Sequence, residues 1–226
     1  MDMIKRYAVY YAPPEGDFAS RASAWLGWDA AAGRPLTPPD LGLSAAEITR
    51  DPCKYGFHGT LKPPFRLAGG RDADELQRAL AELAGRLAPV TLPGLHLASL
   101  GGFLALVPQG DTAPLQALAA TVVAALDGLR APLIQAEIAR RRPEHLTPRQ
   151  RELLDLWGYP YVMEEFRFHL TLTDRLEEPL ATQAAQILEA HFAPVLPRPF
   201  QVADLCLFGE AEDGRFHLLH RYTLSG

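Results

Sequence analysis

Cysteine, long apolar runs and excess positive charge are all scarce in this chain of 226 residues. The two cysteines, Cys53 and Cys206, are too few for a disulfide scaffold and are typical of a reducing compartment. No stretch reaches the roughly 18–20 apolar residues of a membrane-spanning helix, and the first residues lack the apolar core of a secretory signal. We therefore expect a cytoplasmic protein that does not enter a membrane.

Basic residues are outnumbered by acidic ones, with 22 Lys and Arg against 27 Asp and Glu and a net charge of −5. Surfaces that bind long nucleic acids are usually basic, so we expect no extended nucleic-acid surface. This balance leaves room for a small basic pocket that holds a single phosphate. The expected partner is therefore a small phosphorylated substrate.

Several motifs that bind metals, nucleotides or acyl groups are also missing. The chain has no Cys-x-x-Cys pair, no His-Glu-x-x-His helix, no calcium-binding loop, no Gly-rich phosphate loop and no Gly-x-Ser-x-Gly elbow. We expect neither a cofactor nor a dedicated metal site.

The chain is well supplied with the residues of a folded core, because 48% of it is hydrophobic. Apolar periodicity and turn residues predict alternating strands and helices, hence an α+β fold. The predicted strands cover residues 4–11, 55–65, 95–100, 103–107, 165–173, 201–208 and 215–223. The predicted helices cover about 17–31 and 72–88, start at Pro114 and Thr147, and surround Leu180.

An internal repeat organises the chain. Residues 57–61 (FHGTL) match residues 168–172 (FHLTL) at four of five positions. After each motif come an amphipathic helix, the tripeptide Ala-Pro-Val and two more strands, which indicates a duplicated αβ unit. We predict one bilobal domain over 1–226, with lobe one at about 1–110, lobe two at about 111–226 and an insertion at about 131–160.

The repeated motif has the form His-x-Thr, and alternation along a strand places its histidine and threonine on one face. The expected polar rows are His58, Thr60 and Lys62 in the first copy, and Arg167, His169, Thr171 and Thr173 in the second. Two symmetric lobes would bring these rows together across a cleft. Histidine titrates near neutral pH, so one ring can act as base and the other as acid. Threonine hydroxyls can hydrogen-bond phosphate oxygens, and Lys62 can stabilise developing negative charge.

Two further groups are candidates for substrate binding. Tyr10 and Tyr55 can stack on a base or a sugar, although packing at the rim or in the core explains them equally well. Arg140, Arg141, Arg142, Arg149 and Arg151 form a basic cluster within the insertion. They can bind a second phosphate or a nucleotide tail, or they can belong to a solvated surface.

The two His-x-Thr motifs resemble those of the two-histidine (2H) phosphoesterase superfamily, which includes RNA 2′,3′-cyclic phosphodiesterases and bacterial 2′-5′ RNA ligase-like proteins. Longer segments are more particular and are similar to a branch assigned to phosphonate metabolism, encoded beside carbon–phosphorus lyase genes. These segments cover residues 6–11, 55–65, 146–161 and 166–173.

The resemblance implies a bilobal α+β fold in which two antiparallel sheets flank a central cleft, with helices outside. It implies that His58 and His169 form a metal-independent acid–base pair and that Thr60 and Thr171 hold the phosphate. The implied activity is hydrolysis of a cyclic phosphodiester, of a nucleotide or of a sugar, such as the ribose cyclic phosphate left by carbon–phosphorus cleavage.

Two other functions remain open from the residues. His58, His169 and a carboxylate such as Glu165 would form the site of a divalent-metal phosphohydrolase. Alternatively, the chain is a non-catalytic module that binds a phosphorylated ligand or an RNA end.

Overall fold

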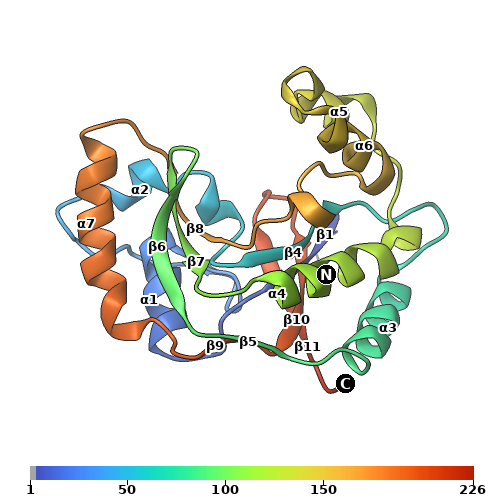
Figure 1. Cartoon of the computed structure of the whole chain (residues 1–226), viewed down its shortest axis with the longest axis horizontal. Coiled ribbons are helices and arrows are strands. Elements are labelled where there is room, and N and C mark those ends of the chain that lie inside the picture. Colours follow the sequence, from blue (N-terminus) through green and yellow to red (C-terminus); the bar gives the residue numbers. More distant parts are fainter. Residues whose placement is uncertain (1–3) are drawn as a thin grey trace.

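Seven strands form one antiparallel sheet at the centre of the computed structural model, which describes residues 4–226 (Figure 1). They are β1 (Arg6–Tyr11), β4 (Gly59–Phe65), β6 (Leu95–Leu100), β7 (Phe103–Pro108), β8 (Leu170–Arg175), β10 (Asp204–Glu210) and β11 (Phe216–Thr223). Their order across the sheet is β11-β10-β1-β4-β8-β7-β6. Two small sheets pair β2 (Trp28–Asp29) with β3 (Arg34–Pro35) and β5 (Val90–Leu92) with β9 (Phe200–Val202). The predicted α+β class with antiparallel sheets is confirmed.

Helices surround this sheet. They are α1 (Asp17–Leu26), α2 (Ala45–Ile48), α3 (Ala73–Ala84), α4 (Ala113–Ala125), α5 (Gln135–Arg140), α6 (Pro148–Trp157) and α7 (Leu180–Phe192). Single 3-10 turns cover Pro52–Lys54, Asp127–Leu129, Pro143–His145, Met163–Glu165 and Ala193–Val195. None of the helices in the described range 4–226 is long and apolar enough to cross a membrane.

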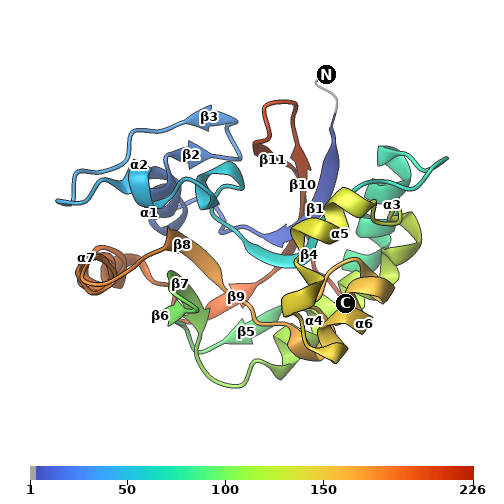
Figure 2. The ribbon, with the colours of Figure 1, turned by 90° about the horizontal axis from the view of Figure 1, so that it is seen from above.

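The two repeats exchange their hairpins. The first repeat runs β4-α3-β5-β6-β7 and the second runs β8-α7-β9-β10-β11. The hairpin β6-β7 lies beside β8 and packs on α7, whereas β10-β11 lies beside β1 and packs on α3. A boundary near residue 110 therefore does not separate the two halves of the sheet. The chain crosses between halves through β5 and β9, which pair with each other and satisfy their backbone groups (Figures 1 and 2).

The halves of the sheet meet at a single backbone pair, Gly59 of β4 with Leu170 of β8. Only glycine fits at position 59 without moving a neighbouring side chain. A Cβ atom added to it would lie 2.3 Å from Cζ of Phe168, which belongs to the second motif. The absence of a side chain in the first motif thus lets the aromatic ring of the second motif pack against its backbone.

Both motif strands begin later than predicted, and β8 also ends later. β4 and β8 start at Gly59 and Leu170, so each motif histidine comes just before its strand. β4 continues through Pro63 and Pro64 to Phe65. The prolines lie at a register shift between the pairs Val9–Lys62 and Tyr7–Phe65, where missing N–H donors are tolerated.

The segment predicted as an insertion carries α5 and α6, which stand together beyond β1 and β4 in Figure 1. Arg66, the residue after β4, holds this segment by a two-pronged ion pair with Glu137 of α5, at 3.0 and 2.9 Å. The same guanidinium donates to the carbonyl of Pro132. Hydrogen bonding to Arg66 lowers the pKa of Glu137 to about 2, so this carboxylate stays charged at neutral pH.

Gly59→Ala is expected to destabilise the protein by about 1–3 kcal/mol, because the added methyl group must displace the Phe168 ring. Denaturant unfolding of the two proteins measures this difference. Gly69→Ala is the matched control, since a Cβ there meets nothing within 4 Å. Equal stability of Gly59→Ala and the wild type would contradict the assigned close contact.

Candidate active site

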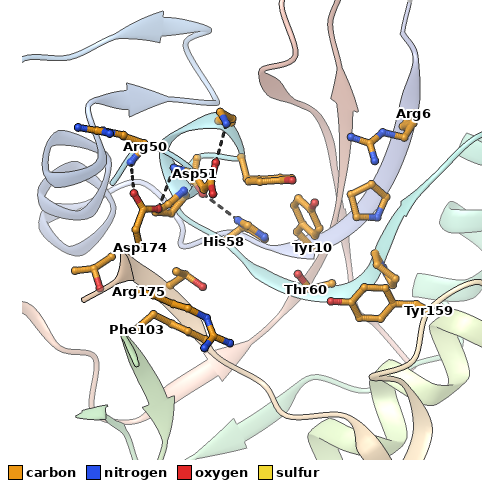
Figure 3. A pocket seen from close by; sticks show the side chains of 18 of the residues that line it. Arg6, Tyr10, Arg50, Asp51, His58, Thr60, Phe103, Tyr159, Asp174 and Arg175 are labelled. Atoms are coloured by element: carbon orange, nitrogen blue, oxygen red, sulfur yellow. Dashed lines mark hydrogen bonds and ion pairs between the residues drawn. The ribbon is translucent and has the colours of Figure 1, made fainter. Parts of the chain in front are cut away.

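One cavity of about 820 Å³ is lined by residues from both motif strands and from the insertion (Figure 3). Of the residues predicted from the sequence, it is lined by Tyr10, Tyr55, His58, Thr60, Thr171 and Thr173. His169 is not among the residues that line it, but its ring centroid lies 5.6 Å from that of the lining residue Phe103. The charge of His169 also lowers the pKa of His58, so the two imidazoles lie within electrostatic range of each other.

The two histidine rings are held in the same way. Nδ1 of His58 is 2.9 Å from the carbonyl oxygen of Gly56, and Nδ1 of His169 is 2.7 Å from that of Arg167. A carbonyl oxygen can only accept, so Nδ1 carries the proton and donates in both rings. This fixes the tautomer and leaves Nε2 of each ring free to take or give a proton.

Burial favours the neutral form of both rings. Desolvation is the main cause that lowers the pKa of His58, from its ordinary 6.5 to about 4. The carbonyl of Gly56 opposes this shift, and the charge of His169 adds to it. Desolvation likewise lowers the pKa of His169, against its hydrogen bond to Arg167. An anion bound between the rings would favour the protonated form and raise both pKa values.

Tyr10 packs against one face of the His58 ring. Its ring stacks on the imidazole at 3.9 Å between centroids and 29° between planes. Only 1% of Tyr10 is exposed, so its face is covered by His58 and is closed to a substrate. Of the two roles open from the sequence, the burial of Tyr10 favours packing over stacking on a substrate. Tyr55 is half-buried, 5.8 Å from the His58 ring and stacked on Phe216.

The threonines divide into two kinds. Thr60 and Thr171 are half-buried and line the cavity from the two motif strands, as the alternation predicted. Thr173 is only 1% exposed, and its Oγ1 accepts a hydrogen bond of 3.0 Å from the backbone N–H of Leu104. Thr173 therefore joins β8 to β7 through its Oγ1.

Lys62 and Arg167 lie outside the cavity, contrary to the sequence-based expectation. For Lys62 the reason is a second register shift in β4, between Thr60 and Lys62. It breaks the alternation that was expected to place Lys62 on the same face as Thr60. The ammonium group of Lys62 is buried, 3.1 Å from the Val123 carbonyl and 3.9 Å from Asp127. The exposed Arg167 donates to the carbonyls of Glu164 and Phe166.

Several charged residues at the cavity were not predicted, namely Arg6, Arg50, Asp51, Lys54, Asp174 and Arg175. The carboxylate of Asp174, just after the second motif, accepts the backbone N–H groups of Arg50 and Asp51. It thereby fixes the loop that leads to the first motif (Figure 3). The sequence held a signal for two of them. Asp174 lies on the second motif strand, and Arg6 lies on the predicted strand 4–11, on the same face as Tyr10.

The carboxylate proposed for a metal site is hydrogen-bonded to the insertion. Oε2 of Glu165 accepts a hydrogen bond of 2.9 Å from the Gln150 side chain. Between residues 4 and 226, no group of three or more His, Cys, Asp or Glu side chains is placed to hold a metal ion.

The family described as "Protein of unknown function (DUF1045)" matches residues 60–217, which include the second motif and about half of the residues that line the cavity, but not His58. The chain belongs to the DUF1045 family. Two curated relatives carry the name ribose 1,5-bisphosphate phosphokinase PhnN. The one from Laribacter hongkongensis (strain HLHK9) is 42% identical over 212 residues, and the one from Janthinobacterium sp. (strain Marseille) is 35% identical over 200 residues. These alignments cover 92% and 85% of this chain but 49% and 44% of the relatives, so the chain spans about half of their length.

Solved structures also resemble this DUF1045 protein. Escherichia coli LigT complexed with 3′-AMP matches 99% of this chain and 100% of its own, at 18% identity and a TM-score of 0.44. TT0787 of Thermus thermophilus matches 98% of both chains, at 16% identity and a TM-score of 0.47. A protein described as a phosphoesterase matches 99% of this chain and 100% of its own, at 18% identity and a TM-score of 0.43. One of these neighbours is described as a phosphoesterase, and the two curated relatives are named for an enzyme that acts on a ribose phosphate.

The stability of the DUF1045 protein is expected to rise with pH between about 4 and 6.5, the folded and ordinary pKa values of His58. Within this window the unfolded chain binds a proton at His58 and the folded chain does not, so acid favours unfolding. Above 6.5 the contribution is complete. Denaturant unfolding across this range measures the slope.

His58→Gln is expected to flatten that slope, because the titrating ring is gone. His145→Gln is the matched control and should retain it, since the His145 side chain is 73% exposed. An unchanged slope in His58→Gln would show that His58 is not the group responsible.

Lys62→Met is expected to leave catalytic efficiency within about threefold of the wild type, because Lys62 does not reach the cavity. When the ammonium group of Lys62 is removed, Asp127 keeps its ion pair with Arg130 at 2.8 Å, so its carboxylate is not left without a cation. Steady-state kinetics checks the efficiency, and a loss of about a hundredfold or more would place Lys62 back in the reaction.

Proposed function

We propose that this DUF1045 protein is a phosphoesterase that hydrolyses a phosphodiester with His58 and His169 as its acid–base pair. One observation carries the proposal. Two imidazoles, each with Nδ1–H bound to a carbonyl two residues earlier, stand just before the strands that meet at Gly59–Leu170. Each ring therefore offers a free Nε2 beside one cavity, which is the arrangement that concerted proton transfer requires.

In this mechanism a neutral imidazole takes a proton from water through Nε2 while the water oxygen bonds to phosphorus. The opposite imidazolium gives its Nε2 proton to the ester oxygen that leaves, so charge and protons balance. His58 is the base and His169 the acid, because His58 is the more enclosed ring and resists protonation more strongly. The bound phosphate raises the pKa of His169 and keeps it protonated.

Thr60 and Thr171 complete the proposed centre. Both hydroxyls face the cavity, one from each motif strand, and each can donate to a non-bridging phosphate oxygen. The phosphate is thereby held between the two rings as negative charge builds up on it. Tyr10 and the two backbone carbonyls keep the imidazoles aligned without touching the substrate.

The substrate we propose is a ribose cyclic phosphate. The name of the curated relatives, ribose 1,5-bisphosphate phosphokinase, supports a ribose carrying phosphate esters as the compound handled by this group of proteins. Hydrolysis of a 1,2-cyclic phosphate on ribose breaks one phosphorus–oxygen bond and yields a ribose phosphate monoester. A cavity of about 820 Å³ has ample room for a pentose with its phosphate groups.

His58→Ala and His169→Ala are each expected to lower turnover of a cyclic phosphodiester by about 10²–10⁴-fold, because each removes one proton-transfer group. Turnover of ribose 1,2-cyclic phosphate, followed by phosphorus NMR, measures the loss. Circular dichroism and thermal melting check that both variants stay folded. His145→Ala, a change at an exposed histidine, is the control and should keep full activity.

Three outcomes would contradict the proposed function. Full activity in either histidine variant would remove the acid–base pair. Loss of activity on dialysis against a chelator, with recovery on adding a divalent ion, would favour a metal-dependent hydrolase. Saturable binding of cyclic phosphates without any turnover would favour a binding module.

A further inference from the structure

The insertion directs one arginine of its basic run into the cavity. Arg140, Arg141 and Arg142 follow one another at the end of α5, and only Arg141 lines the cavity. Its side chain packs on the ring of another lining residue, Tyr159. The run is therefore not a uniform solvated surface, since one of its three side chains belongs to the wall of the site.

Arg141 is held in place by Tyr159. Its guanidinium carbon lies 4.6 Å from the centre of the Tyr159 ring, a cation–π contact. That ring in turn packs on the small core formed by Val123, Leu153 and Val162. The guanidinium is thereby docked on a rigid surface before any ligand arrives.

The charge of Arg141 is not neutralised by the protein. Of the other cations at the cavity, Arg6 is paired with Glu210 and Lys54 with Asp51, whereas Arg50 and Arg175 have no ion pair among the described residues. Within the described part of the chain, no carboxylate lies within ion-pair distance of Arg141, although its charge lowers the pKa of the neighbouring Tyr159 against the larger, opposite effect of burial. An unpaired guanidinium that faces a cavity favours an anionic ligand.

The guanidinium of Arg141 lies against Tyr159, at one side of the cavity. Figure 3 shows its support, Tyr159, on the same side as Arg6, with His58 between this side and Asp174. A ligand whose phosphodiester sits at His58 would therefore extend toward Arg141 at its other end. The ion pair between Arg66 and Glu137 fixes α5, and with it Arg141, to the end of β4.

We infer that Arg141, seated on Tyr159, binds a second anionic group of the substrate, a phosphomonoester remote from the bond that is cut. This inference rests on the proposed function for the position of the first phosphate. The planar guanidinium can donate two parallel hydrogen bonds to a phosphate, which a lysine cannot match. The preferred substrate is then a sugar cyclic phosphate that carries a phosphomonoester at its opposite end.

The test compares ribose 1,2-cyclic phosphate with the same compound phosphorylated at O5. The wild type should prefer the phosphorylated compound in kcat/KM. Arg141→Ala should lower kcat/KM for it about ten- to hundredfold, chiefly through KM, and stay within about threefold for the other compound. Arg141→Lys should lie between, because it keeps the charge without the planar fork. The neighbouring change Arg140→Ala is the matched control and should behave as the wild type.

Equal loss on both compounds in Arg141→Ala, or no preference in the wild type, would overturn the inference. A binding measurement separates it from the proposed function. Calorimetry with ribose 1,5-bisphosphate should give a Kd about tenfold or more weaker for Arg141→Ala than for the wild type. If neither compound is turned over, the proposed function fails while this binding difference still decides the role of Arg141: weaker binding supports it, and equal binding overturns it.

Discussion

The close contact between Gly59 and Phe168 is the constraint on which the site depends. The two halves of the sheet join at one backbone pair, so nothing else in the sheet fixes how near the two motifs come. A glycine in one motif admits the aromatic ring of the other, and the strands can then start side by side. Because each histidine directly precedes its strand, this contact also sets where the two imidazoles stand.

The rings are oriented by backbone carbonyls rather than by carboxylates. A carboxylate partner would favour the imidazolium form, whereas a neutral carbonyl fixes the tautomer with a weaker effect on the pKa. For both rings the lowering of the pKa by burial exceeds its raising by the hydrogen bond, so the neutral form is favoured. An anion bound between the rings would supply the missing negative charge, so the protonation state of the pair would depend on occupancy of the cavity.

Much of this arrangement could be predicted from the sequence, because the information is local or repeated. The matched motifs revealed the duplication, and strand alternation placed Thr60 and Thr171 on the cavity wall. Alternation failed for Lys62, where a bulge, which leaves no clear mark in the residue pattern, turned the side chain away. The roles of Arg6, Asp174 and Arg141 depend on contacts between distant segments, and a single sequence does not encode those visibly.

The exchange of hairpins has a consequence for the order in which the sheet can form during synthesis. Strand β1 leaves the ribosome before the other six strands of the sheet, yet one of its edges is paired by β10, one of the last two to be made. Neither repeat can complete its own half of the sheet. The hairpin β6-β7 of the first repeat pairs with β8 of the second, and the hairpin β10-β11 of the second repeat pairs with β1. The nascent chain must therefore keep an open strand edge until β10 has emerged, and the seven-stranded sheet is complete only with β10 and β11.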